Sequence, residues 1–179
     1  ADLSLDPDWN PESLAGAWVE ALARAGNKVF VGGSFSHVGD AERRHLAALD
    51  AQTGKVTAWT VPDIGDVSRL AVSGNALVVA RSDWRPLRDP LVAIDVTTAQ
   101  ILPWNRIPSI TRTSGDFEGP GYINVLEVSC DTVFVAGDFT SINGQSRTKL
   151  AAFSVTTGEL TAWNPNLIGG VVQIVAQDD

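Results

Sequence analysis

An all-β fold built from repeated units of four short strands is predicted by three observations. First, one pattern recurs: an apolar strand, a polar loop, a Leu-Ala-Ala strand, and a Thr-Gly turn that leads to a tryptophan, most clearly at residues 29–59 and 133–163. Second, β-branched and aromatic residues fill the short apolar runs, which favours strand over helix. Third, Gly-Asn pairs separate successive runs, and such pairs form tight hairpin turns. Four short strands per unit are typical of a β-propeller blade.

The first strand of each unit is expected at residues 19–25, 67–72 and 123–128, with a fourth copy at 171–176. The copies share one register, with spacings of 48, 56 and 48 residues between Leu22, Leu70, Leu126 and Ile174. A helix over residues 13–24, capped by Ser13, is the alternative for the first copy because that stretch is rich in Ala and Leu. The β-branched residues of the other copies argue against it, so we expect a strand.

The units predict a single domain, residues 1–179, made of four-stranded antiparallel blades at about 13–59, 60–105 and 106–166. Residues 167–179 begin a fourth blade, to which residues 1–12 would contribute. Propellers typically close with four to eight blades. The chain is therefore expected to be a segment of a longer propeller, or to be completed by another chain, or to share one blade between its two ends. We favour the first, because an open arc leaves strand edges exposed.

Composition narrows the class of partner. The net charge of −8 argues against a nucleic-acid ligand, because phosphate binding needs a basic face. No apolar run has the length of a membrane-spanning helix, so no membrane insertion is expected. Cys130 is the single cysteine, which excludes an internal disulfide.

Residues that recur at one position in every unit are expected to serve the fold. The repeated tryptophans should pack blade on blade, since a blade cannot bury its own face. The glycines should allow close backbone approach or a bulge. An arginine that recurs before the third strand, at positions 43, 88 and 147, should bind loop carbonyls. The structural positions are Gly32, Gly33, Phe35, Asp50, Trp59, Trp104, Gly137, Phe139 and Trp163.

Binding residues are expected where the pattern breaks. The second unit replaces the glycines with residues 80–86, and the third is preceded by an insertion, residues 112–121, which we expect to be a loop on the binding face. The candidates are Trp84, Arg85, Arg88, Asp116, Phe117, Glu118 and Tyr122.

No catalytic residue, metal site or cofactor is predicted, because no nucleophile, phosphate-binding or zinc motif is present. His45 is expected to be solvated, and His37 has no further ligand at metal-binding spacing. Calcium at clustered acidic turns is the one alternative.

The repeat also resembles a known family. The pattern GG-x-F-x-x-V-G, then R-x-x-L-A-A-L-D, then T-G-x-x-T-A-W is similar to the delta-60 repeats of bacterial secreted β-propellers. It is carried here by Gly32, Gly33, Phe35, Val38, Gly39, Arg43, Leu46, Asp50, Thr53, Gly54 and Trp59, and again from Gly137 to Pro165. Ala99 in place of the turn glycine and Ser154 in place of the strand aspartate depart from it. A weaker similarity links the turn to the tryptophan-docking motif of quinoprotein alcohol dehydrogenases, in which the tryptophan stands one residue nearer the glycine.

The resemblance implies an extracellular or cell-surface protein. We therefore expect a non-enzymatic scaffold for binding, adhesion or assembly, whose partners are the rest of the propeller or another copy of the chain, and a protein or glycan ligand. One alternative is part of a propeller enzyme, either a quinoprotein-like oxidoreductase or a glycan-active enzyme. The other is a subunit of an extracellular filament or surface layer.

Overall fold

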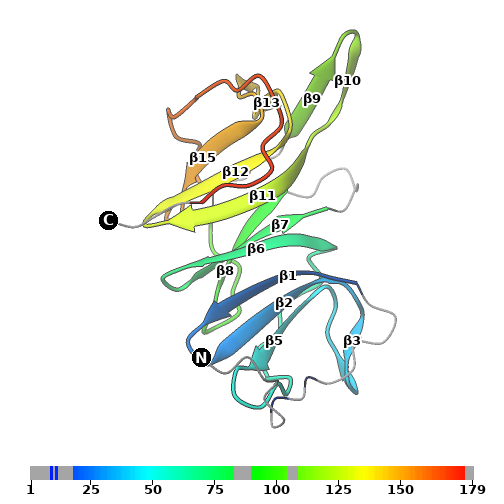
Figure 1. Cartoon of the computed structure of the whole chain (residues 1–179). Helices are drawn as coiled ribbons and strands as arrows, with labels where there is room; N and C mark the ends of the chain where they lie inside the picture. Colours follow the sequence, from blue (N-terminus) through cyan, green and yellow to red (C-terminus); the bar gives the residue numbers. More distant parts are fainter. Residues whose placement is uncertain (1–8, 10, 12–17, 83–89, 105–108, 176–179) are drawn as a thin grey trace.

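The computed structural model describes residues 9, 11, 18–82, 90–104 and 109–175 (Figure 1). These residues form fifteen strands and no helix. It follows that the part of the chain described here contains no helix long and apolar enough to cross a membrane. The predicted all-β class is confirmed.

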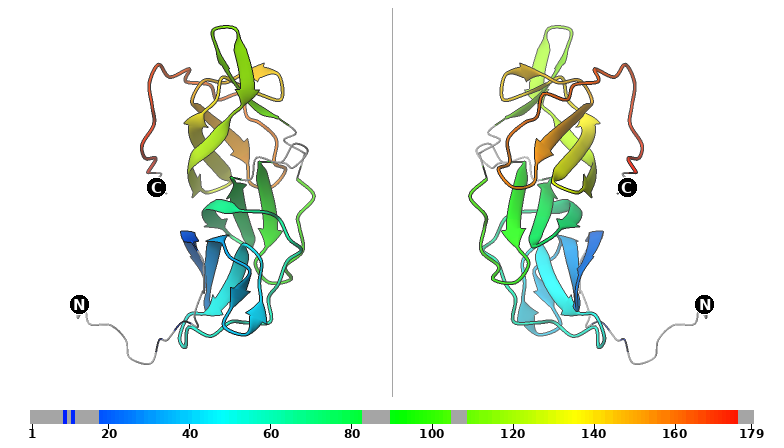
Figure 2. Two further views of the ribbon diagram at one scale, coloured as in Figure 1. Left: turned by 90° about the vertical axis from the view of Figure 1, so that its right-hand side faces the viewer. Right: turned by 90° about the vertical axis from the view of Figure 1, so that its left-hand side faces the viewer.

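Three antiparallel sheets form the blades, which lie in a row along the molecule (Figures 1 and 2). Blade 1 contains β1 (Trp18–Ala25), β2 (Lys28–Ser34) and β5 (Leu46–Asp50). Blade 2 contains β6 (Val67–Ser73), β7 (Ala76–Arg81) and β8 (Leu91–Asp95). Blade 3 contains β11 (Tyr122–Ser129), β12 (Thr132–Asp138) and β15 (Leu150–Ser154). The fourth, outermost strand of each blade is present as one bridge, Leu49 to Val56, Ile94 to Ile101, or Phe153 to Leu160.

The expected register holds across the three blades. Leu22 pairs with Val31, and the same pairing joins Leu70 to Val79 and Leu126 to Val135. The hairpin turns that follow have positive φ at the same position: 57° at Gly26, 53° at Gly74 and 49° at Cys130. The helix alternative fails over residues 18–24, which form most of β1. Its residues 13–17 lie outside the described part of the chain.

Two expectations were wrong. The insertion expected as a loop is a hairpin, in which Phe117 pairs with Ser114 across a turn at Gly115, whose φ is 60°. Its strands are β9 (Ile110–Ser114) and β10 (Phe117–Pro120), which join β13 (Ser141–Ile142) and β14 (Gln145–Ser146) in the order β10-β9-β13-β14. In blade 1 the corresponding loop contains only the pair β3 (His37–Val38) and β4 (Ala41–Glu42). The fourth first-strand copy, 171–175 as far as it is described, is not a strand, because no described segment pairs with it.

Two of the three core clusters lie between blades, and the third, which includes Phe35 and Val38, lies within blade 1. At the first junction Phe30 and Trp59 of blade 1 pack with Leu70 of blade 2 in one cluster of buried side chains. The Trp59 indole Nε1–H also donates to the Asp95 carbonyl of blade 2, at 3.4 Å. At the second junction the Trp104 Nε1–H donates to the Val155 carbonyl of blade 3, at 2.7 Å. The structure thus places the tryptophans of blades 1 and 2 where one blade meets the next.

Each first strand carries a bulge at the same place, for example between Val19 and Ala21. Next to the bulges of blades 1 and 3 the second strand approaches closely. A Cβ on Gly33 would lie 1.9 Å from the Trp18 carbonyl oxygen, and one on Gly137 would lie 1.9 Å from that of Tyr122. Only glycine fits these two positions without moving backbone.

We predict that Gly33→Ala lowers the free energy of unfolding by about 2–3 kcal/mol, because the new methyl group forces β1 away from β2. Gly170→Ala is the matched control, since a Cβ there has no atom within 4 Å and the change should stay within about 0.5 kcal/mol. Urea unfolding of both variants measures the difference. Equal stabilities would mean that the close approach at the bulge is not a packing constraint.

Candidate functional site

The β9–β10 hairpin projects from the end of the molecule that blade 3 forms (Figure 1). Its base is anchored in the blade by backbone and hydroxyl contacts. The Thr140 N–H donates to the Thr111 carbonyl at 2.8 Å, and the Thr111 and Ser141 hydroxyls lie 2.6 Å apart. Ile110 begins the hairpin as a buried side chain in the core of blade 3. The hairpin therefore has a fixed base and a tip that is free of the blade.

Three charged side chains meet beside this base. The Arg112 guanidinium donates to Asp138 Oδ2 at 2.9 Å, and the Lys149 ammonium donates to Asp138 Oδ1. Arg112 Cζ also lies 6.0 Å from the centroid of the Tyr122 ring. The hydrogen bond from Lys149, followed by that from Arg112, holds the pKa of Asp138 below its ordinary value, although partial burial opposes the shift. The result is an ordered patch in which an aromatic ring lies next to two cations and a carboxylate.

Of the binding residues predicted from sequence, the structure places three on this hairpin and one beside its base. Asp116 and Glu118 are exposed, Phe117 begins β10, and Tyr122 begins β11 with 39% of its surface exposed. Trp84, Arg85 and Arg88 lie outside the described residues. The sequence did not predict that Arg112, Asp138 and Lys149 come together beside this hairpin.

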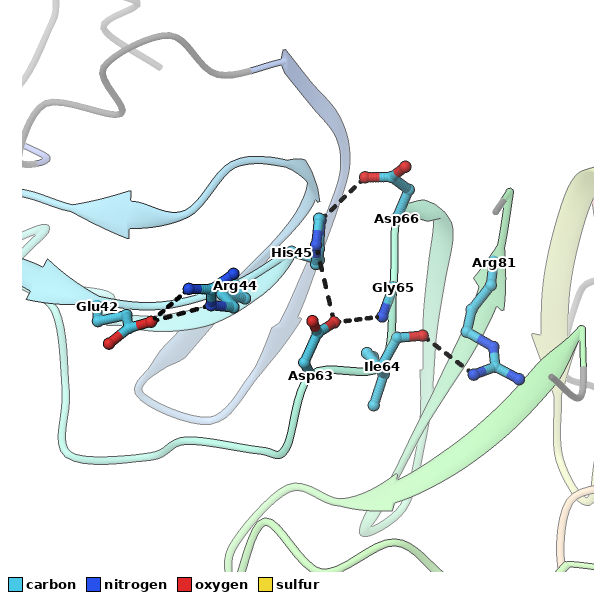
Figure 3. A network of polar contacts seen from close by, with 8 residues as sticks. All are labelled: Glu42, Arg44, His45, Asp63, Ile64, Gly65, Asp66 and Arg81. Atoms are coloured by element: carbon cyan, nitrogen blue, oxygen red, sulfur yellow. Dashed lines mark hydrogen bonds and ion pairs between the residues drawn. The ribbon is translucent and has the colours of Figure 1, made fainter. Parts of the chain in front are cut away.

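A second polar cluster joins blade 1 to the segment that leads into blade 2 (Figure 3). His45 Nδ1 lies 2.9 Å from an Asp66 carboxylate oxygen, and His45 Nε2 lies 3.8 Å from Asp63. The Asp63 carboxylate also accepts the Gly65 N–H at 2.9 Å. The His45 side chain is only 22% exposed, so the expectation that it is solvated was wrong. Its carboxylate partners come from the link between blades, which the repeat does not reveal.

His45 and Lys149 stand at one repeat position, directly before the third strand, with φ of 65° and 66°. Each faces a carboxylate: His45 faces Asp66, in the segment that leads into blade 2, and Lys149 faces Asp138 of blade 3. This position thus supplies a basic side chain to a polar contact in both blades.

The repeated aspartates and arginines serve turns. Asp50 accepts the backbone N–H groups of Gln52 and Thr53, at 3.0 and 2.9 Å, and the Thr53 contacts lower its pKa most. Arg43 donates to the Thr57 carbonyl at 2.9 Å, and Arg147 does the same to Thr161. The Asp50 contacts close the Thr-Gly turn of blade 1, and the arginine contacts fix the last segment of blades 1 and 3.

Blade 3 has Ser154 where blade 1 has Asp50, and another residue takes over the carboxylate's role. Asp131, from the hairpin turn after β11, accepts the Thr156 N–H at 3.1 Å and the Ser154 hydroxyl at 3.3 Å. Among the residues described, no group of three or more His, Cys, Asp or Glu side chains is placed to hold a metal ion.

Comparison with known proteins supports the propeller fold. The model of a family described as a domain of unknown function (DUF5122) beta-propeller matches residues 131–151. No curated protein matches the chain. Among solved structures, the computationally designed Ika4 protein superposes with a TM-score of 0.57 at 16% identity, over 93% of this chain and 85% of that one.

BamB from Moraxella catarrhalis is a further structural neighbour, with a TM-score of 0.45 and 14% identity. The match covers 84% of this chain but only 51% of the BamB chain. The β-propeller fold rests on the blades seen in the structure and on the family match at residues 131–151.

We predict that Asp138→Asn destabilises the protein by about 1 kcal/mol at pH 7, a modest effect because solvent screens the partly exposed partners. The folded pKa of Asp138 is lowered, so its contribution is full above the unfolded value and is lost as pH falls through the folded value. The difference in melting temperature between variant and wild type should therefore shrink from pH 7 to pH 3. Glu118→Gln, which changes an exposed carboxylate on the same hairpin, is the control, and a pH-independent difference for Asp138→Asn would contradict the prediction.

Proposed function

We propose that this β-propeller segment is a non-enzymatic extracellular scaffold that binds a protein partner through the β9–β10 hairpin and the adjoining Tyr122. The observation that carries the proposal is the projection of this hairpin from a blade that otherwise repeats blade 1 (Figure 1). A convex, anchored hairpin suits insertion into a groove on another protein better than it suits enclosure of a small molecule. The extracellular setting is supported by the resemblance to secreted propeller repeats.

The chemistry of the hairpin surface also supports a protein ligand. Tyr122 offers a half-exposed ring beside Arg112, whose guanidinium is bound by Asp138. Exposed Asp116 and Glu118 add negative charge at the tip. Tyrosine and arginine are enriched at interface hot spots, and surrounding charges set the choice of partner and the association rate.

The recurring residues support a scaffold role for the blades themselves. Trp59, Asp50 and Arg43 are each engaged by packing or by a turn hydrogen bond within the blades. This leaves the departures from the repeat as the positions free to carry a specific function.

The test uses proteins secreted into culture medium by the source cells, passed over the immobilised chain. A retained protein is purified and its dissociation constant measured by calorimetry. Asp116→Lys and Glu118→Lys should each weaken binding about tenfold or more, which corresponds to about 1.4 kcal/mol, without changing the melting temperature. Asp40→Lys, an exposed carboxylate on the blade 1 loop, is the control and should leave binding unchanged.

Binding that is indifferent to the two hairpin substitutions would overturn the proposal. Retention of no protein, together with hairpin-dependent binding to a panel of immobilised glycans, would also overturn it and would assign the hairpin to sugar recognition.

A further inference from the structure

Exposed large apolar side chains gather at the two ends of the row of blades. In the part of the chain that the structure describes, only Ile101 and Tyr122 lie elsewhere. We call the set on β1 the head, and it consists of Trp18, Val19 and Leu22. We call the set that follows blade 3 the tail, and it consists of Trp163, Leu167, Ile168, Val172 and Val175.

The interior junctions show what these positions do when a neighbour is present. Leu22 of the head is 63% exposed, whereas its equivalents Leu70 and Leu126 are 9% and 8% exposed. Trp163 of the tail is 44% exposed, whereas Trp59 is 6% exposed. Both ends therefore carry side chains of the kind that are buried where two blades meet.

The tail also keeps local features of an inner junction. Phe134 and Trp163 form an edge-to-face pair with centroids 5.4 Å apart, as Phe30 and Trp59 do at 4.9 Å. At the first junction, Phe30 and Trp59 of blade 1 contribute to the cluster that contains Leu70 of blade 2. Blade 3 thus has the same aromatic pair, but no following blade among the described residues packs against it, and Trp163 is more exposed than Trp59.

The segment after blade 3 continues this geometry. Val171 and Ile174 are half-buried, at the repeat positions of Val67 and Leu70, while Val175 is 71% exposed. Val175 holds the repeat position of Ala23 and Ala71. Ala23 packs against the cluster of Leu70, and Ala71 packs against the cluster of Leu126. At both inner junctions this position therefore packs against the cluster that contains the leucine of the following blade.

We propose that the head of one copy of this chain packs on the tail of a second copy, with Leu22 and Val175 in one apolar cluster, as Leu70 and Ala23 are at the first junction. The second copy is the occupant because one chain carries both halves of the contact that its own blades repeat twice. The interface is heterologous, so successive contacts produce a closed ring or an open filament. It uses neither the β9–β10 hairpin nor Tyr122, and it stands apart from the function proposed above.

Charge sets the conditions under which copies associate. The chain carries a net charge of −8, so two copies repel each other at low ionic strength. The head and tail side chains are uncharged, so their contact itself is not weakened by screening. Association should therefore strengthen between about 20 mM and 300 mM salt, unlike an interface that rests on ion pairs.

Sedimentation velocity over a concentration series, with the chain alone, tests the proposal. Wild type should form dimers or larger species as concentration rises, whereas Leu22→Lys and Val175→Lys should each raise the concentration needed by at least tenfold. Both positions are exposed in the single chain, so neither lysine should unfold it. Ile101→Lys is the matched control, because Ile101 is 49% exposed on blade 2, away from both ends.

Mixing the two variants separates a head-to-tail contact from a symmetric one. Leu22→Lys retains an intact tail and Val175→Lys an intact head, so the mixture should form a 1:1 dimer that neither variant forms alone. A mixture that stays monomeric overturns the proposal, and so does a Val175→Lys variant that dimerises by itself. A strictly monomeric wild type overturns it too, and would indicate that further blades of one polypeptide cover the two ends.

Discussion

Each junction between neighbouring blades is built from buried apolar side chains of both blades, and the rest of the structure depends on that packing. Phe30 and Trp59 of blade 1 are covered by Leu70 of blade 2, and the Trp59 indole is tied to blade 2 by a hydrogen bond. Most of the buried apolar surface therefore lies between sheets, in the two clusters that join neighbouring blades. The same packing explains why equivalent side chains are buried inside the row and exposed at its ends.

Most of the fold could be predicted because comparison of the repeat copies decides between helix and strand where one copy alone does not. The stretch around Leu22 reads as a helix by itself, but its register with Leu70 and Leu126 indicates a strand, which the structure confirms. The β9–β10 hairpin could not be predicted in this way, because the insertion has no copy to compare. The outermost strands shrink to single bridges, since turn contacts such as those of Asp50 and Arg43 fix that segment with little ladder pairing.

The polar clusters were less predictable than the fold, because their partners are far apart in sequence. Blade 3 has Asp138 and Lys149 at the repeat positions where blade 1 has Ser34 and His45. The sequence alone does not show that Arg112 also binds the Asp138 carboxylate. Ser154 has no carboxylate to accept the turn hydrogen bonds that Asp50 accepts in blade 1. Asp131, which lies in a different turn, supplies that carboxylate in blade 3. In a repeat fold, a role can pass to a neighbouring position while the geometry it serves stays the same.

Blade 2 packs against a neighbouring blade on both of its faces, which determines where local unfolding begins. Val78 and Val79, adjacent on β7, belong to the second and first junction respectively, and both are fully buried. Breaking blade 2 therefore breaks both junctions, whereas releasing β1 breaks one. Local opening should begin at the ends and propagate inward, so that backbone amides of β7 exchange with solvent only in near-global unfolding while those of β1 exchange through fraying. The elements with least local stability are thus the ones that carry the head and the tail, and any partner that covers them would also stabilise the row as a whole.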